Sequence, residues 1–180
     1  MKFSMLIRIV VPIAALSLAS AADAQVTGGK LVDRRDQAEG WYLPVHGAVL
    51  ADGKKANEVT VRLYKDNEIV GDLPVEKNGT FIAELDIDQV FTLLIMKPGY
   101  QNEMLTIDTT LPEGLVEYPA YECTVNMDPA SKYAGKEEGF YLDFPAAIVR
   151  YNAEMGGFYH SENYLGHIQG KLAGYAQASF

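Results

Sequence analysis

Cysteine is almost absent from this 180-residue chain, in which Cys123 is the only cysteine. Tryptophan and histidine are also rare, with one and three residues. A single cysteine excludes an intramolecular disulfide, so the folded state must depend on a packed core. Basic residues are also scarce, because 15 lysines and arginines face 24 acidic residues and leave a formal net charge of -9. This charge disfavours nucleic acid and anionic membranes, and we predict neither as a partner.

Long apolar runs are missing after the first residues, so we predict no transmembrane segment in the mature chain. The chain opens with a cationic segment that contains Lys2 and Arg8, and an apolar run from Ile9 to Leu18 follows. Ala22-Asp23-Ala24 then offers the small residues of a cleavage site. This order is typical of a secretory signal peptide, which we predict over residues 1–24. The mature protein is then exported to the periplasm, the outer membrane or the cell surface, and an uncleaved anchor is the alternative.

Short alternating runs between turn residues make up the middle of the chain. Val59, Val61 and Leu63 alternate with polar residues, which is the pattern of a half-buried strand. Comparable runs, separated by turn signals, occupy residues 45–51, 68–73, 76–87, 90–97, 101–109 and 121–127. Seven short strands of this kind predict an all-β fold, an antiparallel seven-stranded β-sandwich over residues 45–127.

The two flanks of this region have other patterns. Residues 25–44 are charged and contain glycine without sustained periodicity, so we predict a flexible N-terminal arm. Residues 128–180 are predicted to form a C-terminal extension made of a loop, a hairpin and a short helix. Ser161 is expected to cap that helix, because apolar residues recur at helical spacing after it.

The stretch from Val45 to Asp108 resembles the carboxypeptidase regulatory-like modules, which are β-sandwiches of transthyretin-like type. The resemblance rests on turn and core positions, and it implies structural roles for Gly47, Gly53, Gly79, Phe81, Gly99 and Tyr100. It also implies a non-catalytic module of an exported bacterial envelope protein, as found in Bacteroidetes. Peptidase activity is not implied, because the His-x-x-Glu zinc motif of the carboxypeptidase catalytic domain is missing.

Two residue types, cysteine and histidine, are candidates for chemistry. Cys123 alternates with Tyr121 and Val125, which predicts a buried and unreactive structural thiol. His160 and His167 come nearest to a metal-binding group, but a seven-residue spacing matches none of the common zinc motifs. We therefore predict no catalytic residue, no cofactor and no metal. A metal-dependent enzyme that uses His160 and His167 is kept as an alternative.

Aromatic residues crowd the last third of the chain, and four of them are candidate partner contacts: Tyr151, Phe158, Tyr159 and Tyr164. Aromatic rings provide large contact areas, and tyrosine adds a polar tip that suits interfaces. The sequence therefore predicts a non-enzymatic structural or protein-binding component of a bacterial cell-envelope complex. A carbohydrate-binding module that uses the same rings is the alternative, and packing of the rings on the sandwich is the competing interpretation.

Overall fold

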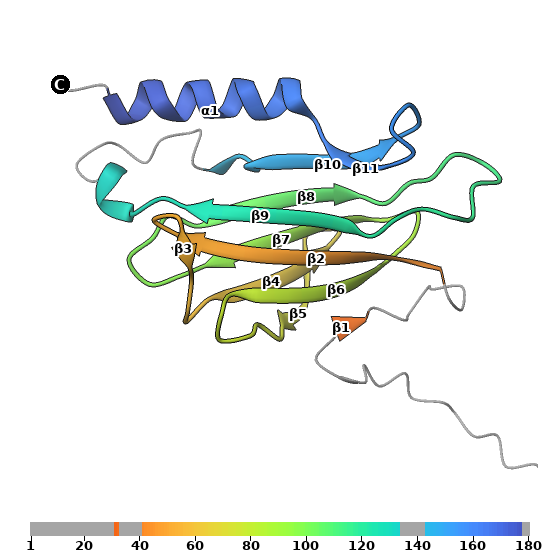
Figure 1. Ribbon diagram of the computed structural model, residues 1–180, viewed down its shortest axis with the longest axis horizontal. Coiled ribbons are helices and arrows are strands. Elements are labelled where there is room, and N and C mark those ends of the chain that lie inside the picture. The colour runs from red at the N-terminus through yellow and green to blue at the C-terminus, as the bar shows by residue number, and fades with distance from the viewer. Residues whose placement is uncertain (1–30, 33–40, 134–142, 178–180) are drawn as a thin grey trace, which may run out of the picture.

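The computed structural model describes residues 31–32, 41–133 and 143–177, and the predicted signal peptide lies outside these ranges. Within them the chain is predominantly β, with one α-helix at its C-terminal end (Figure 1). The strands are β1 (Leu31–Val32), β2 (Tyr42–Ala51), β3 (Lys54–Lys55), β4 (Thr60–Lys65), β5 (Glu68–Leu73), β6 (Thr80–Asp86), β7 (Val90–Met96), β8 (Glu103–Asp108), β9 (Tyr121–Met127), β10 (Ala147–Asn152) and β11 (Gly157–His160). The helices are the 3-10 helix η1 (Ala130–Tyr133) and α1 (Glu162–Gln177).

Two sheets form the layers of a β-sandwich, as the alternating pattern predicted. In the first sheet, β6 and β9 flank β2, with the two-residue strands β1 and β3 at its margins. The second sheet has the order β11-β10-β8-β7-β4-β5. Each of the seven predicted strand segments overlaps one strand, namely β2 and β4 to β9. Two details differ on the N-terminal side, because β2 already begins at Tyr42 and β1 pairs with β6.

The prediction that pairing is antiparallel throughout is wrong. β2 pairs with β9 in parallel, and so do β8 with β10 and β1 with β6. The physical reason lies in the connections, because the chain leaves β8 in one sheet and crosses over residues 109–120 before it enters β9 in the other. Hydrophobic alternation reports which face of a strand is buried, but it carries no information about strand direction.

The core lies between the sheets and contains inward-facing side chains from both, among them Leu43, Val45, Leu63, Phe91, Leu93 and Ile107. Gly47 of β2 lies directly opposite Phe81 of β6. A Cβ atom at Gly47 would lie 2.0 Å from the Phe81 ring, so only glycine leaves room for this ring. Gly79 precedes β6 with a φ of +79°, and its carbonyl oxygen accepts a hydrogen bond from the Val49 amide at 2.9 Å. These contacts fit the structural roles expected for the two glycines.

The other predicted structural residues lie in turns at one end of the sandwich. Gly53 follows Asp52 in the β2–β3 turn, where both residues have positive φ, which is the conformation of a tight hairpin turn. Gly99 also has a positive φ, of +82°, after Pro98. The Tyr100 hydroxyl donates a hydrogen bond of 2.8 Å to Asp52 Oδ2 and so connects the two turns.

The C-terminal extension is part of the sandwich rather than an addition beside it. β10 and β11 form the predicted hairpin, and β10 joins the second sheet beside β8. Val149 and Phe158 from this hairpin are buried in the main core. This differs from the prediction of a β-sandwich confined to residues 45–127. Alternation of apolar residues in the C-terminal segment predicts strands, but it does not show whether these strands join the sandwich or bind another molecule.

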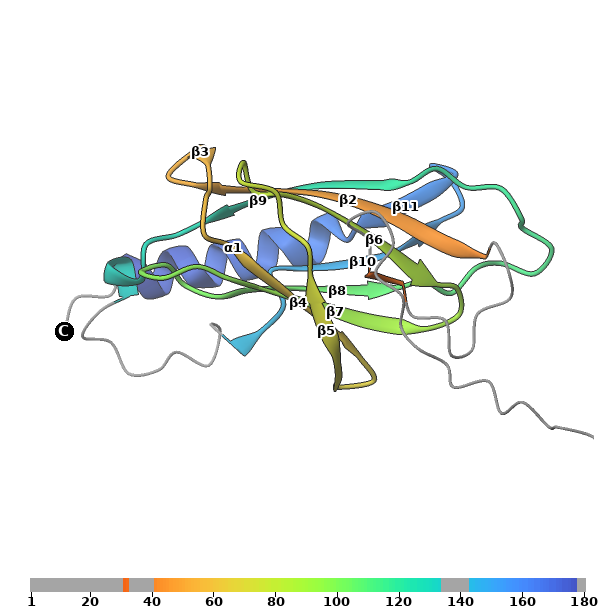
Figure 2. The ribbon, with the colours of Figure 1, turned by 90° about the horizontal axis from the view of Figure 1, so that it is seen from below.

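α1 begins where it was predicted, after Ser161. The Tyr164 amide donates to the Ser161 hydroxyl at 3.3 Å, which is the expected capping contact. Figures 1 and 2 show α1 lying outside the strands and running along β10. Ile168 of α1 is buried. Over the part of the chain that the structure describes, no helix is both long and apolar enough to cross a bilayer.

Candidate binding surfaces

The β10–β11 hairpin and the start of α1 form a concave surface with a volume of about 720 Å³. Three of the four predicted partner contacts lie on it, although they are up to 13 positions apart in the sequence. We use the name tyrosine-lined surface for the concave face formed by Arg150, Tyr151, Asn152, Glu154, Tyr159 and Tyr164.

Cross-strand pairing determines which side chains this surface presents. Arg150 of β10 lies directly opposite Tyr159 of β11, so both project from the outer face of the hairpin. Tyr159 is 37% exposed, and Arg150 Nε lies 3.5 Å from Asp108 Oδ2 of the neighbouring strand. The result is an aromatic ring beside a cation that remains largely in solvent.

Tyr164 is held more firmly than Tyr159. Its hydroxyl donates a hydrogen bond of 2.7 Å to the Pro145 carbonyl oxygen, which ties the start of α1 to the segment before β10. Burial raises the pKa of Tyr164, so the hydroxyl stays protonated and can keep donating. Tyr164 therefore supports the surface while its ring contributes to the lining.

The prediction that Phe158 is a partner contact is wrong. Phe158 is 4% exposed and belongs to the core. Its ring meets those of Tyr118 and Tyr151 edge-on, with centroids 5.8 Å and 5.6 Å away. Strand alternation explains the difference, because Phe158 and Tyr159 are adjacent and must point to opposite faces of the sheet. Tyr151 is intermediate, since it packs on Phe158 and also borders the concave surface.

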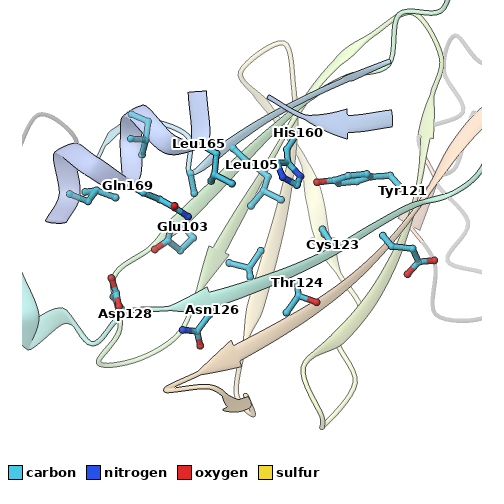
Figure 3. A pocket seen from close by; sticks show the side chains of 16 residues that line it. Glu103, Leu105, Tyr121, Cys123, Thr124, Asn126, Asp128, His160, Leu165 and Gln169 are labelled. Carbon is cyan, nitrogen blue, oxygen red and sulfur yellow. The ribbon is translucent and has the colours of Figure 1, made fainter. Parts of the chain in front are cut away.

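A second cavity, of about 450 Å³, lies where α1 passes the free edge of β9 (Figure 3). We call it the edge groove. β9 forms one wall, and apolar side chains from β8 and α1 form much of the rest: Leu105, Leu165, Ile168 and Leu172. Polar side chains enter from several elements, among them Glu103, Asp128, His160 and Gln169. His160 borders both cavities, and in Figure 3 its ring faces the Tyr121 hydroxyl.

Glu103 is the most perturbed acid of the edge groove. Its pKa rises to about 7, first because burial disfavours the charged form and then because Asp128 repels it, while Lys132 acts in the opposite direction. Asp128 is itself well satisfied, since Oδ2 accepts hydrogen bonds from Lys132 Nζ at 2.6 Å and from the Tyr133 hydroxyl at 2.9 Å. No hydrogen bond or ion pair joins the Glu103 carboxylate to another described residue.

Glu103 was not singled out from the sequence, although a signal was present. It shares strand parity with Leu105 and Ile107, both of which are buried, so its side chain points toward the interior. A charged residue on the inward face of a predicted strand marks a position where burial and charge conflict.

Cys123 also lines the edge groove. Its side chain shares a strand face with Tyr121, as predicted, but it is half-buried at the groove instead of enclosed in the core. Burial, followed by the nearby negative charge of Glu122, raises the pKa of the Cys123 thiol to about 12. The thiol therefore stays protonated, which is the unreactive form.

The two histidines proposed as alternative metal ligands lie on different elements. His160 ends β11, and His167 lies in α1. Leu165, Ile168 and Leu172 mark the groove side of α1, and His167 lies about 200° around the helix from Leu165. Among residues 41–133 and 143–177, no three His, Cys, Asp or Glu side chains gather closely enough to hold a metal ion.

Fold and surfaces together define the chain as a two-sheet β-sandwich protein with two concave surfaces near its C-terminal helix. No protein-family model matches the chain, and no curated protein matches its sequence. Solved structures resemble it distantly. 3-Chlorocatechol 1,2-dioxygenase from Rhodococcus opacus 1CP matches at 14% identity and a TM-score of 0.40, over 63% of this chain and 68% of that one.

Two further solved structures show the same level of likeness. Catechol 1,2-dioxygenase from Pseudomonas arvilla C-1 matches at 8% identity and a TM-score of 0.41, over 62% of this chain and 60% of its own. The protein S.CueP matches at 13% identity and a TM-score of 0.35, over 50% of this chain and 64% of its own. At TM-scores below 0.5, these likenesses assign neither a fold nor an activity to this chain.

Proposed function

We propose that this chain is an exported, non-enzymatic binding protein that takes part in a bacterial cell-envelope complex. The observation that carries the proposal is the convergence of Tyr159 and Tyr164 with Arg150 on one concave, partly exposed surface, which Tyr151 borders. Tyrosine is enriched at protein interfaces because its ring supplies contact area and its hydroxyl can still form hydrogen bonds. Arg150 beside Tyr159 adds a second residue type that is common at such contacts.

The exported location rests on the signal-peptide pattern of residues 1–24, and we assign the protein to the periplasm, the outer membrane or the cell surface. We also propose a relationship to the carboxypeptidase regulatory-like modules. The contact of Gly47 with Phe81 supports it, as does the position of Gly53 and Gly99 in turns with positive φ. Modules of this kind act by packing beside other domains or proteins.

Co-purification from native envelope extracts tests the binding role. Tyr159→Ala removes an exposed ring and leaves the core intact, so the fold should persist while the partner is lost. Ile69→Ala is the matched control, because Ile69 is 61% exposed on β5, at the other edge of the second sheet. Partner recovery that is equal with both variants would show that the tyrosine-lined surface does not bind the partner.

Carbohydrate binding is the second candidate, and one observation favours it. Asn152 and Glu154 lie on the same concave surface as the Tyr159 ring, and sugars are bound by stacking on rings combined with polar contacts at their hydroxyls. Titration with soluble envelope oligosaccharides separates the two candidates. A protein-binding surface predicts no saturable oligosaccharide binding, whereas a carbohydrate module predicts saturable binding that Tyr159→Ala abolishes.

A further inference from the structure

β9 is an edge strand whose outer side has no partner in the described chain. It pairs with β2 alone, over all seven residues of the strand. Successive residues of a strand direct their backbone N–H and C=O groups to alternate sides, so every second residue of β9 points these groups away from β2. Within residues 41–133 and 143–177, no further backbone hydrogen bond reaches Tyr121–Met127. Among the described residues, nothing pairs with this edge, which leaves its hydrogen-bonding groups available to another strand.

This open edge borders a ready-made cavity. The edge groove runs beside β9 (Figure 3), and Leu165, Ile168 and Leu172 of α1 are part of its lining. An extended peptide alongside β9 would form main-chain hydrogen bonds with the strand. Its alternate side chains would then point into the groove between β9 and α1. The unpaired backbone groups of β9 thus lie next to an apolar pocket, and proteins that bind peptides by strand addition use this combination.

The charge of the groove defines the chemistry of the occupant. Glu103 enters the groove from β8 and has no hydrogen-bond or ion-pair partner among the described residues. Gln169 of α1 points toward it in Figure 3, so a donor placed there would meet both side chains. A lysine or arginine side chain supplies the missing donor and opposite charge. A second copy of this chain is a poor match, because its formal net charge of -9 would repel the same acidic groove.

We propose that the β9 edge binds an extended segment of a partner protein by strand addition, with an apolar side chain in the edge groove and a lysine or arginine at Glu103. This site adjoins the tyrosine-lined surface at His160, but Glu103 and β9 lie outside that surface and Tyr159 lies outside the edge groove. Glu103→Gln and Tyr159→Ala therefore test the two assignments independently.

Synthetic peptides test the inference on the full mature protein. The probe is a seven-residue peptide that matches β9 in length and alternates valine with threonine, with one lysine placed at each valine position in turn. Two N-methylated forms of the best binder block the backbone N–H groups of alternate residues. A glutamate peptide and a norleucine peptide replace the lysine by an acid and by a neutral chain. Affinity is measured by fluorescence anisotropy, and hydrogen exchange of residues 121–127 is followed by NMR.

Strand addition predicts a distinctive set of results. Of the two N-methylated peptides, one no longer binds and the other binds as tightly as the unmethylated peptide. In the complex, alternate backbone amides of β9 exchange their hydrogens more slowly. Glu103→Gln weakens the lysine peptide about tenfold, which is the value of one charge-assisted hydrogen bond, and leaves the norleucine peptide unchanged. Glu113→Gln, at an exposed loop position, is the matched control and changes neither.

Other outcomes overturn the proposal. Absence of binding at millimolar peptide excludes strand addition at this edge. Equal effects of both methylation patterns, or protection outside β9, place the peptide elsewhere. If the glutamate peptide binds as well as the lysine peptide, the assigned role of Glu103 is wrong. If Glu103→Gln fails to fold, the exchange data on the unmodified protein still decide the question.

Discussion

Replacing Glu103 by glutamine should stabilise the protein at neutral and alkaline pH. Glu103→Gln keeps the size and shape of the side chain but removes a charge that lies in a partly closed groove. Burial and the neighbouring Asp128 raise the pKa of Glu103 from 4.5 to about 7, against the attraction of Lys132. The carboxyl therefore binds a proton more tightly in the folded state than in the unfolded state.

The pH dependence follows from this difference. The proton-linked stabilisation is fully present below pH 4.5 and is lost as the pH rises through about 7. A shift of this size corresponds to about 3 kcal/mol as an upper value, because each pKa unit is worth about 1.4 kcal/mol. The wild-type chain should thus lose up to this amount relative to Glu103→Gln between pH 4.5 and pH 8.

Urea denaturation followed by circular dichroism measures this effect directly. The difference in unfolding free energy between wild type and Glu103→Gln should be small near pH 4.5 and largest near pH 8. Glu113→Gln, whose side chain is exposed in a loop, should show no such trend. If the difference in unfolding free energy between wild type and Glu103→Gln does not change with pH, the charged form of Glu103 is not disfavoured in the edge groove and the reasoning is refuted.

Three further results are expected. Gly47→Ala should lower the unfolding free energy by about 1 to 3 kcal/mol, because its Cβ would collide with the Phe81 ring, and Phe81→Leu should recover part of the loss in the double variant. Deletion of residues 144–180 should abolish cooperative thermal unfolding, since it removes the buried Phe158 and two strands of the second sheet, β10 and β11; a sharp transition would contradict this. Cys123 should react far more slowly with a bulky thiol reagent at pH 8 than in denaturant, and equal rates would disprove its protected state.

The strands could be predicted because each carries its own evidence in the sequence. Alternation in segments such as Val59–Lys65 arises because one face of the strand is buried. Which residues are buried does not depend on the strand that lies beside it. The parallel pairing of β2 with β9 could not be predicted, because it depends on how residues 109–120 cross between the sheets. Only the tertiary arrangement contains that information.

The binding surfaces show a similar division. Tyr159 and Tyr164 could be selected by residue type, but their convergence on one surface depends on the β10–β11 register and on the start of α1. Phe158 was selected for the same reason as Tyr159, its aromatic ring, but it lies on the buried face of the hairpin while Tyr159 lies on the exposed face. Glu103 was visible through its strand parity, yet its unpaired state could be seen only once α1 and β9 were placed beside it.

Site-specific photocrosslinking in the native bacterial envelope tests the central claim most directly. A photoreactive phenylalanine analogue replaces Tyr159 on the tyrosine-lined surface, and the same analogue replaces Ile69 on the other edge of the second sheet as a control. A protein-binding role predicts one discrete adduct with an envelope protein from position 159 and none from position 69. Absence of an adduct at position 159, or the same adducts from both positions, would contradict a protein-binding role for this surface.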